Sequence, residues 1–406
     1  MTEAVSSISP ARHPLRVAVF RRLWIGSAVS QLGDQFYFVA LPWIVLQLTG
    51  SALAMSTVLM AGAIPRGVLM LMGGAISDRL SPRRILIATA IARTLLVAAI
   101  GALLALHCLR MAELYALAFA FGVADAFAMP AGQAYLPLIV KAEQLASANS
   151  LLQGSSQLIM IAGPAPAAIV LKLLGAACAF FLDALSFVAI LGALWTLPDP
   201  PPRARGAAAP LSRSIVEGLA YVRRDVPLAT LALLATVINF CLVGPIGVGL
   251  PYLAAMSFRS PTALAAMLSS VATGGLLGAV LAGVWKIRRK GLLMLGGSAF
   301  LGLCLAVTGG LSKLWLICAV LVLMGCAAGL VNLHILTWIQ QRAAAEIRGR
   351  VMSVLMVASV GLAPVSIVVA GFLAQWHMQR MFVIAGGATV AVAAAAARLR
   401  TLRELE

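Results

Sequence analysis

The chain has 406 residues, of which 62% are hydrophobic and only 11% are charged, and its formal net charge is +17. Soluble globular domains contain roughly 25% charged residues, so this composition excludes an ordinary soluble fold and indicates an integral membrane protein. The positive charge is spread over short loops and is not gathered in one basic domain with aromatic residues, which argues against nucleic acid as a partner.

Twelve apolar stretches follow one another along the chain. Each is about 17 to 27 residues long, and a helix needs roughly 20 residues to cross the hydrocarbon layer. Because an open backbone finds no water there, we expect an all-α protein with twelve transmembrane helices. The predicted spans are residues 23–48, 52–77, 85–106, 112–136, 148–174, 176–197, 228–253, 263–284, 292–311, 314–338, 351–376 and 381–397.

The basic residues alternate between the gaps that separate these stretches. Of the 30 Lys and Arg residues, 23 lie before the first stretch, after the last one or in every second gap. Positive loops stay on the cytoplasmic side, so we predict a multi-pass membrane protein with both termini in the cytoplasm. The polar residues 1–13 lack the features of a removable signal peptide. The six Cys residues are scattered without metal-ligand spacing, so we expect no metal or other cofactor.

Ionisable side chains occur inside the first two predicted spans. Asp34 lies about ten residues into the first span, and Arg66 follows Pro65 in the middle of the second. Since adjacent antiparallel helices bring residues of similar depth together, we predict an Asp34–Arg66 contact. Charges in hydrocarbon indicate a cavity, although a purely structural ion pair also explains them. Three aromatic residues beside Asp34 are candidates for the cavity wall: Phe36, Tyr37 and Phe38.

The loop after the second span combines small, acidic and basic residues in the order Gly73-Gly74-Ala-Ile-Ser-Asp78-Arg79-Leu-Ser-Pro-Arg83-Arg84. Small residues allow close helix packing, the aspartate is placed at a helix end beside an interface, and arginines stay in the headgroups or bridge to the other half. We therefore predict a cytoplasmic gate motif, which consists of Gly74, Asp78, Arg79, Arg83 and Arg84.

A second pair of opposite charges is predicted between Arg93 in the third span and Asp125 in the fourth, which lie at similar depth. A carboxylate that exchanges a cationic partner for a proton meets the physical requirement of proton-coupled transport. Asp34 and Asp125 are therefore the proton-coupling candidates, with Arg66 and Arg93 as their charge partners. Gln133, further along the fourth span, is a polar candidate for the cavity.

Proline and small residues mark the fifth span, where Gly154 precedes Gly163-Pro164-Ala-Pro166. A proline frees a backbone carbonyl and small neighbours let another helix approach, so we predict a hinge at Gly163 and Pro164, although proline is common in membrane helices without such a role. Asp183 opens the sixth predicted span near the extracellular side, where we expect a structural role at a helix end in preference to proton coupling.

The sixth and seventh spans are separated by a domain linker. Residues 198–210 contain five prolines and cannot hold a helix. We predict six-helix bundles in residues 1–197 and 228–406, joined by a cytoplasmic linker over residues 198–227. One apolar helical face in this linker fits a short interfacial helix, and a solvated connector fits equally well. That face is formed by Ile215, Leu219 and Val222.

The two halves repeat in sequence, which indicates pseudo-symmetric bundles. A shift of 207 residues takes Gly122, Asp125 and Gln133 to Gly329, Asn332 and Gln340. The last six spans contain no acidic residue, so the polar candidates for the cavity there are Asn239, Asn332 and His334. His334 either titrates near neutral pH or satisfies a local hydrogen bond.

Taken together, the loop motif, the twelve spans, the Pro-rich linker and the half repeat resemble the major facilitator superfamily over essentially the whole chain. Two residues of the loop motif depart from the family pattern: Ser81 replaces the usual glycine, and Pro82 replaces a residue that is often basic. The corresponding loop of the second half, residues 283–290, keeps the basic residues but has no acidic one. The pair Gly163-Pro164 resembles the glycine-proline element of antiporters in this family. Five segments resemble the branch of macrolide-efflux proteins and the enterobactin exporter: residues 20–24, 30–34, 143–149, 181–187 and 347–352.

The resemblance implies a secondary active transporter of the bacterial inner membrane in which two bundles rock about a central cavity. We expect a monomeric, proton-coupled exporter of a moderately hydrophobic small molecule, such as a drug or a siderophore, surrounded by membrane lipids. The alternatives are an uptake permease or a lipid flippase on the same fold, while a channel fits the half repeat and the proline-bearing helices less well. The chain has no HExxH sequence, nucleophile elbow or Walker loop, so we do not expect an enzyme.

Overall fold

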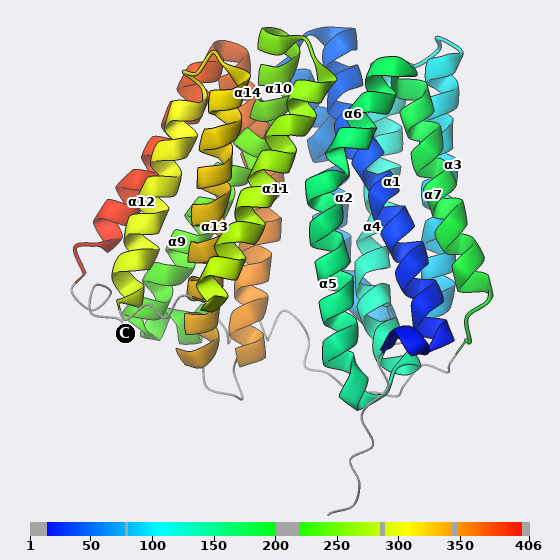
Figure 1. Ribbon diagram of the computed structural model, residues 1–406, viewed down its shortest axis with the longest axis horizontal. Coiled ribbons are helices and arrows are strands. Elements are labelled where there is room, and N and C mark those ends of the chain that lie inside the picture. Colours follow the sequence, from blue (N-terminus) through cyan, green and yellow to red (C-terminus); the bar gives the residue numbers. More distant parts are fainter. Residues whose placement is uncertain (1–13, 78–79, 200–218, 285–288, 343–347, 400–406) are drawn as a thin grey trace, which may run out of the picture.

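The computed structural model describes residues 14–77, 80–199, 219–284, 289–342 and 348–399, and the long elements in these ranges are all helices (Figure 1). Asp78 and Arg79 of the predicted gate motif lie outside the described residues, as does most of the predicted linker. Within the linker, residues 219–224 are helical and Val222 is buried, but the rest of the predicted interfacial helix is not described.

In the described residues of the first half, seven α-helices follow the first six predicted spans. The fifth span is divided at Gly163, because Pro164 and Pro166 have no N–H group to donate to the preceding turn. The helices are α1 (Ala18–Thr49), α2 (Ala52–Ser77), α3 (Pro82–Ala105), α4 (Met111–Ile139), α5 (Leu145–Ala162), α6 (Pro164–Leu173) and α7 (Gly175–Trp195).

The second half follows the remaining predicted spans, with two irregular places. The seventh span contains two π-helical turns, Pro245–Gly249 and Ala254–Phe258, and Pro245 and Pro251 in this span remove backbone donors from the helix. The last two spans are joined in one helix that His377 interrupts, with φ −155° and ψ 102°. The elements are α9 (Val226–Gly244), η3 (Pro245–Gly249), α10 (Leu250–Leu253), η4 (Ala254–Phe258), α11 (Pro261–Val284), α12 (Lys290–Thr308), α13 (Leu314–Arg342) and α14 (Arg348–Ala396).

Ten stretches of the described residues are long and apolar enough to cross a membrane. The last of them, Gly361–Ala396, contains the interruption at His377, and α1 adds a further helix that carries Arg21, Arg22 and Asp34. Counting α1 and dividing the last stretch at His377 accounts for the twelve predicted spans. The predicted fold class, an all-α integral membrane protein, is therefore confirmed.

Two close helix crossings occupy equivalent places in the two halves. Where α2 packs against α4, a Cβ atom on Gly122 would lie 2.1 Å from the carbonyl oxygen of Gly62. Where α11 packs against α13, a Cβ atom on Gly329 would lie 2.3 Å from the carbonyl oxygen of Gly275. Gly122 and Gly329 are related by the predicted shift of 207 residues, so the spatial arrangement agrees with the sequence repeat.

The two halves are in direct contact at the end of the molecule where α2 begins. Helices α1 to α7 and α9 to α14 form two groups in Figure 1, and contacts between the groups join α2 to α14 and α6 to α11. The Ala52 N–H donates a hydrogen bond to Gln375 Oε1 at 2.8 Å. One turn further, a Cβ atom on Gly371 would lie 2.0 Å from Ser56 Oγ. The helices therefore approach closely across the boundary between the halves.

Replacing Gly122 by valine is expected to destabilise the protein, because the α2–α4 crossing has no room for a β-branched side chain. Overpacking of this kind costs about 1–3 kcal/mol, so thermal unfolding of the purified protein in detergent is expected at a lower temperature. Gly132→Val on the same helix is the matched control, since no atom lies within 4 Å of a Cβ there. Equal unfolding temperatures for the two variants would show that this crossing does not limit stability.

Candidate functional site

Ionisable side chains from four helices meet inside the first half. On α3, the Nη2 atom of Arg93 lies 2.5 Å from Asp34 Oδ1, and its Nη1 atom lies 3.5 Å from Asp125 Oδ1. Arg66 on α2 contacts the other oxygen of Asp125, with Nε 3.2 Å from Oδ2. These four side chains form a continuous ion-pair chain in the order Asp34, Arg93, Asp125, Arg66.

The predicted Arg93–Asp125 pair is confirmed, whereas the predicted Asp34–Arg66 contact is wrong. The reason is that α2 packs most extensively on α4 and much less on α1. Arg66 lies one helical turn after Gly62, and Asp125 lies about one turn after Gly122. The close crossing at these two glycines therefore brings Arg66 to Asp125 and leaves Asp34 to Arg93.

The guanidinium group of Arg93 is held by aromatic rings as well as by carboxylates. Its Cζ atom lies 4.1 Å from the ring centroid of Phe187 on α7 and 5.3 Å from that of Phe121 on α4. The side chain is only 11% exposed, so its charge is stabilised by these neighbours more than by water. One cation thus connects α1, α3, α4 and α7.

A cavity of about 300 Å³ lies between the two halves and borders this chain of charges. Among the described residues that line it, Arg66 and Asp125 are the charged ones, and Tyr37 and Phe38 belong to the same wall. Tyr37 stacks on Phe121, with ring centroids 4.5 Å apart. The second half contributes uncharged residues, which are Val243, Ile246, Gly247, Pro251, Leu268 and Ile367.

Five side chains that the sequence suggested for a cavity wall lie elsewhere. In the part of the chain that the structure describes, they do not border the 300 Å³ cavity. His334 Nδ1 lies 2.8 Å from the Leu330 carbonyl oxygen, one turn earlier in the same helix, which agrees with the local hydrogen-bond alternative. Gln133 and Asn332 are exposed, while Phe36, Asn239 and His334 are half-buried.

A second cavity of about 420 Å³ lies between α2 and α14. Val68 and Val365 in its lining are 59% and 50% exposed, so it opens at the surface of the bundles. Its lining is apolar throughout and consists of Met60, Ile64, Gly67, Val68, Gly361, Pro364, Val365, Val368 and Val369.

Asp183 lies deep inside the first half, close to the ion-pair chain. The predicted position at a helix end is wrong, because α7 begins at Gly175, about two turns earlier. The Asp183 side chain is fully buried, and a Cβ atom on Gly33 of α1 would lie 2.9 Å from its Oδ1. Sequence reasoning identified the residue but assigned it the wrong depth.

The break between α5 and α6 lies against α1. A Cβ atom on Gly163 would lie 2.4 Å from Gln35 Cγ, and Pro164 is buried. Gln35 follows Asp34 in sequence, so the break contacts α1 beside the ion-pair chain. The role of Gly163 and Pro164 as a hinge stays a prediction.

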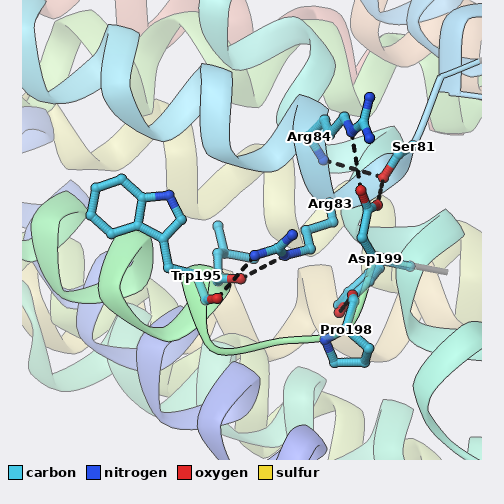
Figure 2. A network of polar contacts seen from close by, with 8 residues as sticks. Ser81, Arg83, Arg84, Trp195, Pro198 and Asp199 are labelled. Atoms are coloured by element: carbon cyan, nitrogen blue, oxygen red, sulfur yellow. Dashed lines mark hydrogen bonds and ion pairs between the residues drawn. The ribbon is translucent and has the colours of Figure 1, made fainter.

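The described part of the gate motif binds the end of α7 (Figure 2). Gly74 lies in the last turn of α2, and Arg83 lies in the first turn of α3. Arg83 donates hydrogen bonds from Nε to the Leu194 carbonyl and from Nη2 to the Trp195 carbonyl, both at 2.9 Å. A cation is favourable at the carbonyl groups that end a helix. Among the described residues, Arg83 therefore connects two helices of the first half and does not bridge to the second half.

Asp199 completes this network, and sequence reasoning missed it. The Ser81 hydroxyl donates to Asp199 Oδ1, and Arg84 Nε lies 3.0 Å from Asp199 Oδ2 (Figure 2). The hydrogen bond from Ser81, followed by the contacts with Arg84, lowers the pKa of Asp199. The Tyr135 hydroxyl donates to the Pro198 carbonyl at 2.8 Å. The start of the predicted linker is thus attached to α3 and α4.

Replacing Asp199 by asparagine is expected to lower stability at pH 7 and to have no effect in strong acid. A carboxyl with a lowered pKa in the folded state stabilises the protein above its unfolded pKa of about 4, and this contribution is lost as the pH falls through the folded pKa. At pH 7 we expect a loss of about 0.2–1 kcal/mol, as for other exposed ion pairs. Thermal unfolding in detergent at a series of pH values measures the difference. A difference that does not change with pH would contradict the assigned contacts.

Comparison with known proteins agrees with the architecture. The sequence profile of the Major Facilitator Superfamily matches residues 23–365 and 233–406. The multidrug efflux pump Tap of Mycolicibacterium fortuitum is 30% identical over 380 residues, which cover 90% of each chain. Macrolide efflux protein A of Streptococcus pyogenes is 24% identical over 401 residues, which cover 95% of this chain and 97% of the relative.

Two solved structures show the same fold at low sequence identity. The nucleoside transporter NupG has a TM-score of 0.76 at 15% identity, over 94% of this chain and 99% of that chain. A bacterial homologue of the iron transporter ferroportin, in an inward-facing state, has a TM-score of 0.75 at 15% identity, over 94% of this chain and 98% of that chain.

Proposed function

Because the chain belongs to the Major Facilitator Superfamily, and is therefore a multi-pass membrane transporter and not an enzyme, we propose that it exports a moderately hydrophobic small molecule in exchange for protons. The relatives named as multidrug and macrolide efflux proteins support export. Of the two cargo classes expected from the sequence, these names favour a drug over a siderophore. The two halves would expose the cavity to each side of the membrane in turn.

The observation that carries this proposal is the position of Asp125. This carboxylate lines the cavity between the halves and shares two guanidinium groups, at 3.2 Å from Arg66 and 3.5 Å from Arg93. A proton taken up by this cluster changes how the carboxylates share the two guanidinium groups, so the partners of Asp125 then rearrange. In this proposal, Asp125 connects the charge of the first half with the occupancy of the cavity.

The shape of the cavity wall supports an amphipathic substrate. Its second-half side consists of uncharged, mainly aliphatic residues, and Phe38 on the opposite wall is 47% exposed. The polar groups are concentrated on the first-half side, at Arg66 and Asp125. A substrate with an apolar body and one polar group would bury the body against the second half and direct the polar group to this pair.

The contacts between the halves support an inward-facing state. In the proposed topology, with both termini in the cytoplasm, the Ala52–Gln375 hydrogen bond lies on the extracytoplasmic side. This contact closes that side in the present conformation. The substrate would accordingly reach the cavity from the cytoplasm or the inner leaflet.

Lipid handling on the same fold is a second candidate, which the apolar cavity of about 420 Å³ between α2 and α14 favours. Its opening at the bundle surface would suit an acyl chain. Transfer of a fluorescent phospholipid between leaflets of proteoliposomes would support this candidate. Efflux of a soluble drug without lipid transfer would support the first proposal.

Asp125→Asn is expected to abolish the response of transport to a proton gradient, because asparagine has no negative charge to hold Arg66 and Arg93 beside the cavity. In proteoliposomes, we expect gradient-driven transport of a macrolide to fall about tenfold or more. Glu113→Gln on the same helix is the matched control: Glu113 is at the start of α4, where its side chain accepts a hydrogen bond from the Arg110 N–H, and glutamine preserves this cap. Unchanged gradient dependence in Asp125→Asn would contradict the proposed role.

Leu268→Trp is expected to weaken substrate binding, because the larger side chain fills part of the 300 Å³ cavity. Leu277→Trp on the same helix is the control, since Leu277 is 48% exposed and does not belong to the cavity lining. We expect macrolide affinity to fall about tenfold in the first variant only. Equal affinities would place the substrate outside this cavity.

A further inference from the structure

We propose that Asp183, which does not line the cavity, holds the exchanged proton in this conformation. Loss of this proton then changes the charge at the cavity, because Arg93 contacts both Asp125 and the surroundings of Asp183. The inference rests on the proton coupling proposed above and deepens it by assigning the proton to a residue. Three features carry it: the burial of the Asp183 carboxyl group, the distribution of positive charge around it, and the position of Arg93.

The Asp183 carboxyl group is placed where its ionised form finds little stabilisation. Its side chain is fully buried, and Oδ2 has no hydrogen-bond partner within the described residues. Oδ1 lies 3.5 Å from the Ser186 hydroxyl, but that hydroxyl donates its shorter hydrogen bond, of 2.7 Å, to the Asp183 main-chain carbonyl. An ionised carboxylate requires several donors when water is absent, whereas a neutral carboxylic acid does not. The surroundings therefore favour the protonated form.

The nearby positive charges already form ion pairs with other carboxylates. Asp34 pairs with Arg93 at 2.5 Å, and Asp125 pairs with Arg66 at 3.2 Å. These four groups are electrically balanced, so an ionised Asp183 would leave the cluster with one uncompensated negative charge. A single proton on Asp183 makes the cluster neutral.

The other ionisable groups near Asp183 do not change the net charge of this cluster. The helices packed against α7 are chiefly α1, α3 and α6. Besides Asp34, α1 contributes the neutral phenol of Tyr37, and α3 contributes Arg93. On α6, Lys172 lies in the last turn and is exposed. Among the described groups, Arg93 is therefore the cation available to a newly ionised Asp183.

Arg93 connects Asp183 with the cavity. Its buried Nε also has no hydrogen-bond partner within the described residues, and its contact with Asp125, at 3.5 Å, is the longest in the ion-pair chain. When the O–H bond of Asp183 breaks, the electron pair stays on the carboxylate and the proton passes to bulk water. The new carboxylate then attracts Arg93 away from Asp125. Because Asp125 lines the cavity, loss of a proton at Asp183 changes the charge that the substrate meets.

Infrared spectroscopy of the purified full-length protein in liposomes tests this assignment without substrate or transport. We expect the wild type at neutral pH to show the carbonyl stretch of a protonated carboxylic acid, and Asp183→Asn to lack it. The controls Asp199→Asn and Glu113→Gln remove carboxyl groups outside the cluster and are expected to keep the band. A wild type without the band, or a band that survives in Asp183→Asn, would overturn the proposal.

Asp34→Asn gives a second test that does not depend on the folding of an Asp183 variant. Removing Asp34 frees Arg93 to pair with Asp183, so the Asp183 carboxyl is expected to lose its proton at a lower pH, by about one unit or more. A band whose midpoint is unchanged or rises in Asp34→Asn would contradict the proposed competition for Arg93.

A transport assay distinguishes the proposed function, proton-coupled export, from the assignment of the proton to Asp183. Asp183→Asn imitates the protonated state, so gradient-driven macrolide efflux is expected to fall about tenfold or more. If wild-type efflux ignores the proton gradient, the proposed function fails, and the infrared band still decides whether Asp183 holds a proton. If wild-type efflux follows the gradient and Asp183→Asn retains it, the assignment to Asp183 fails while the proposed function stands.

Discussion

The structure of the first half depends on one buried cation. Arg93 is 11% exposed, contacts Asp34 and Asp125, and lies over the ring of Phe187. A guanidinium group inside an apolar bundle is stable only with such compensation, and a carboxylate at the same depth is stable only with the guanidinium. The positions of α1, α3, α4 and α7 are thus linked by a single electrostatic requirement. A change at any carboxylate in the cluster alters the partners of the others.

The close glycine crossings determine which charges meet. In both halves a glycine pair lets two helices approach, at Gly62 and Gly122 in the first half and at Gly275 and Gly329 in the second. The first-half crossing carries Arg66 and Asp125 one turn further on, whereas the last six predicted spans contain no acidic residue. The same packing therefore supports a charged first half and an apolar second half. This asymmetry produces a cavity with one polar wall.

Both halves also connect an arginine to an aspartate near the linker. In the first half, Arg84 contacts Asp199 at 3.0 Å. In the second half, Arg342 at the end of α13 contacts Asp225 at 2.8 Å, and Asp225 also caps α9 through the Leu228 N–H. These contacts lie at helix ends, where the charges are more exposed than those around Arg93. Exposed ion pairs contribute little net stability, so these contacts add less to the stability of their halves than the buried cluster around Arg93 does.

The sequence by itself determined the spans, the fold class, the family resemblance and the Arg93–Asp125 pair, because hydrophobic length and residue depth are properties that a linear pattern carries. Only the tertiary structure decided that Arg66 meets Asp125, that Asp183 lies two turns inside α7 beside Gly33, and that Asp199 binds Ser81 and Arg84. In that structure, Asn332 and His334 do not line the cavity of about 300 Å³. Residues at equal depth have several candidate partners, and the choice among them depends on which helices pack together and how each is rotated about its axis.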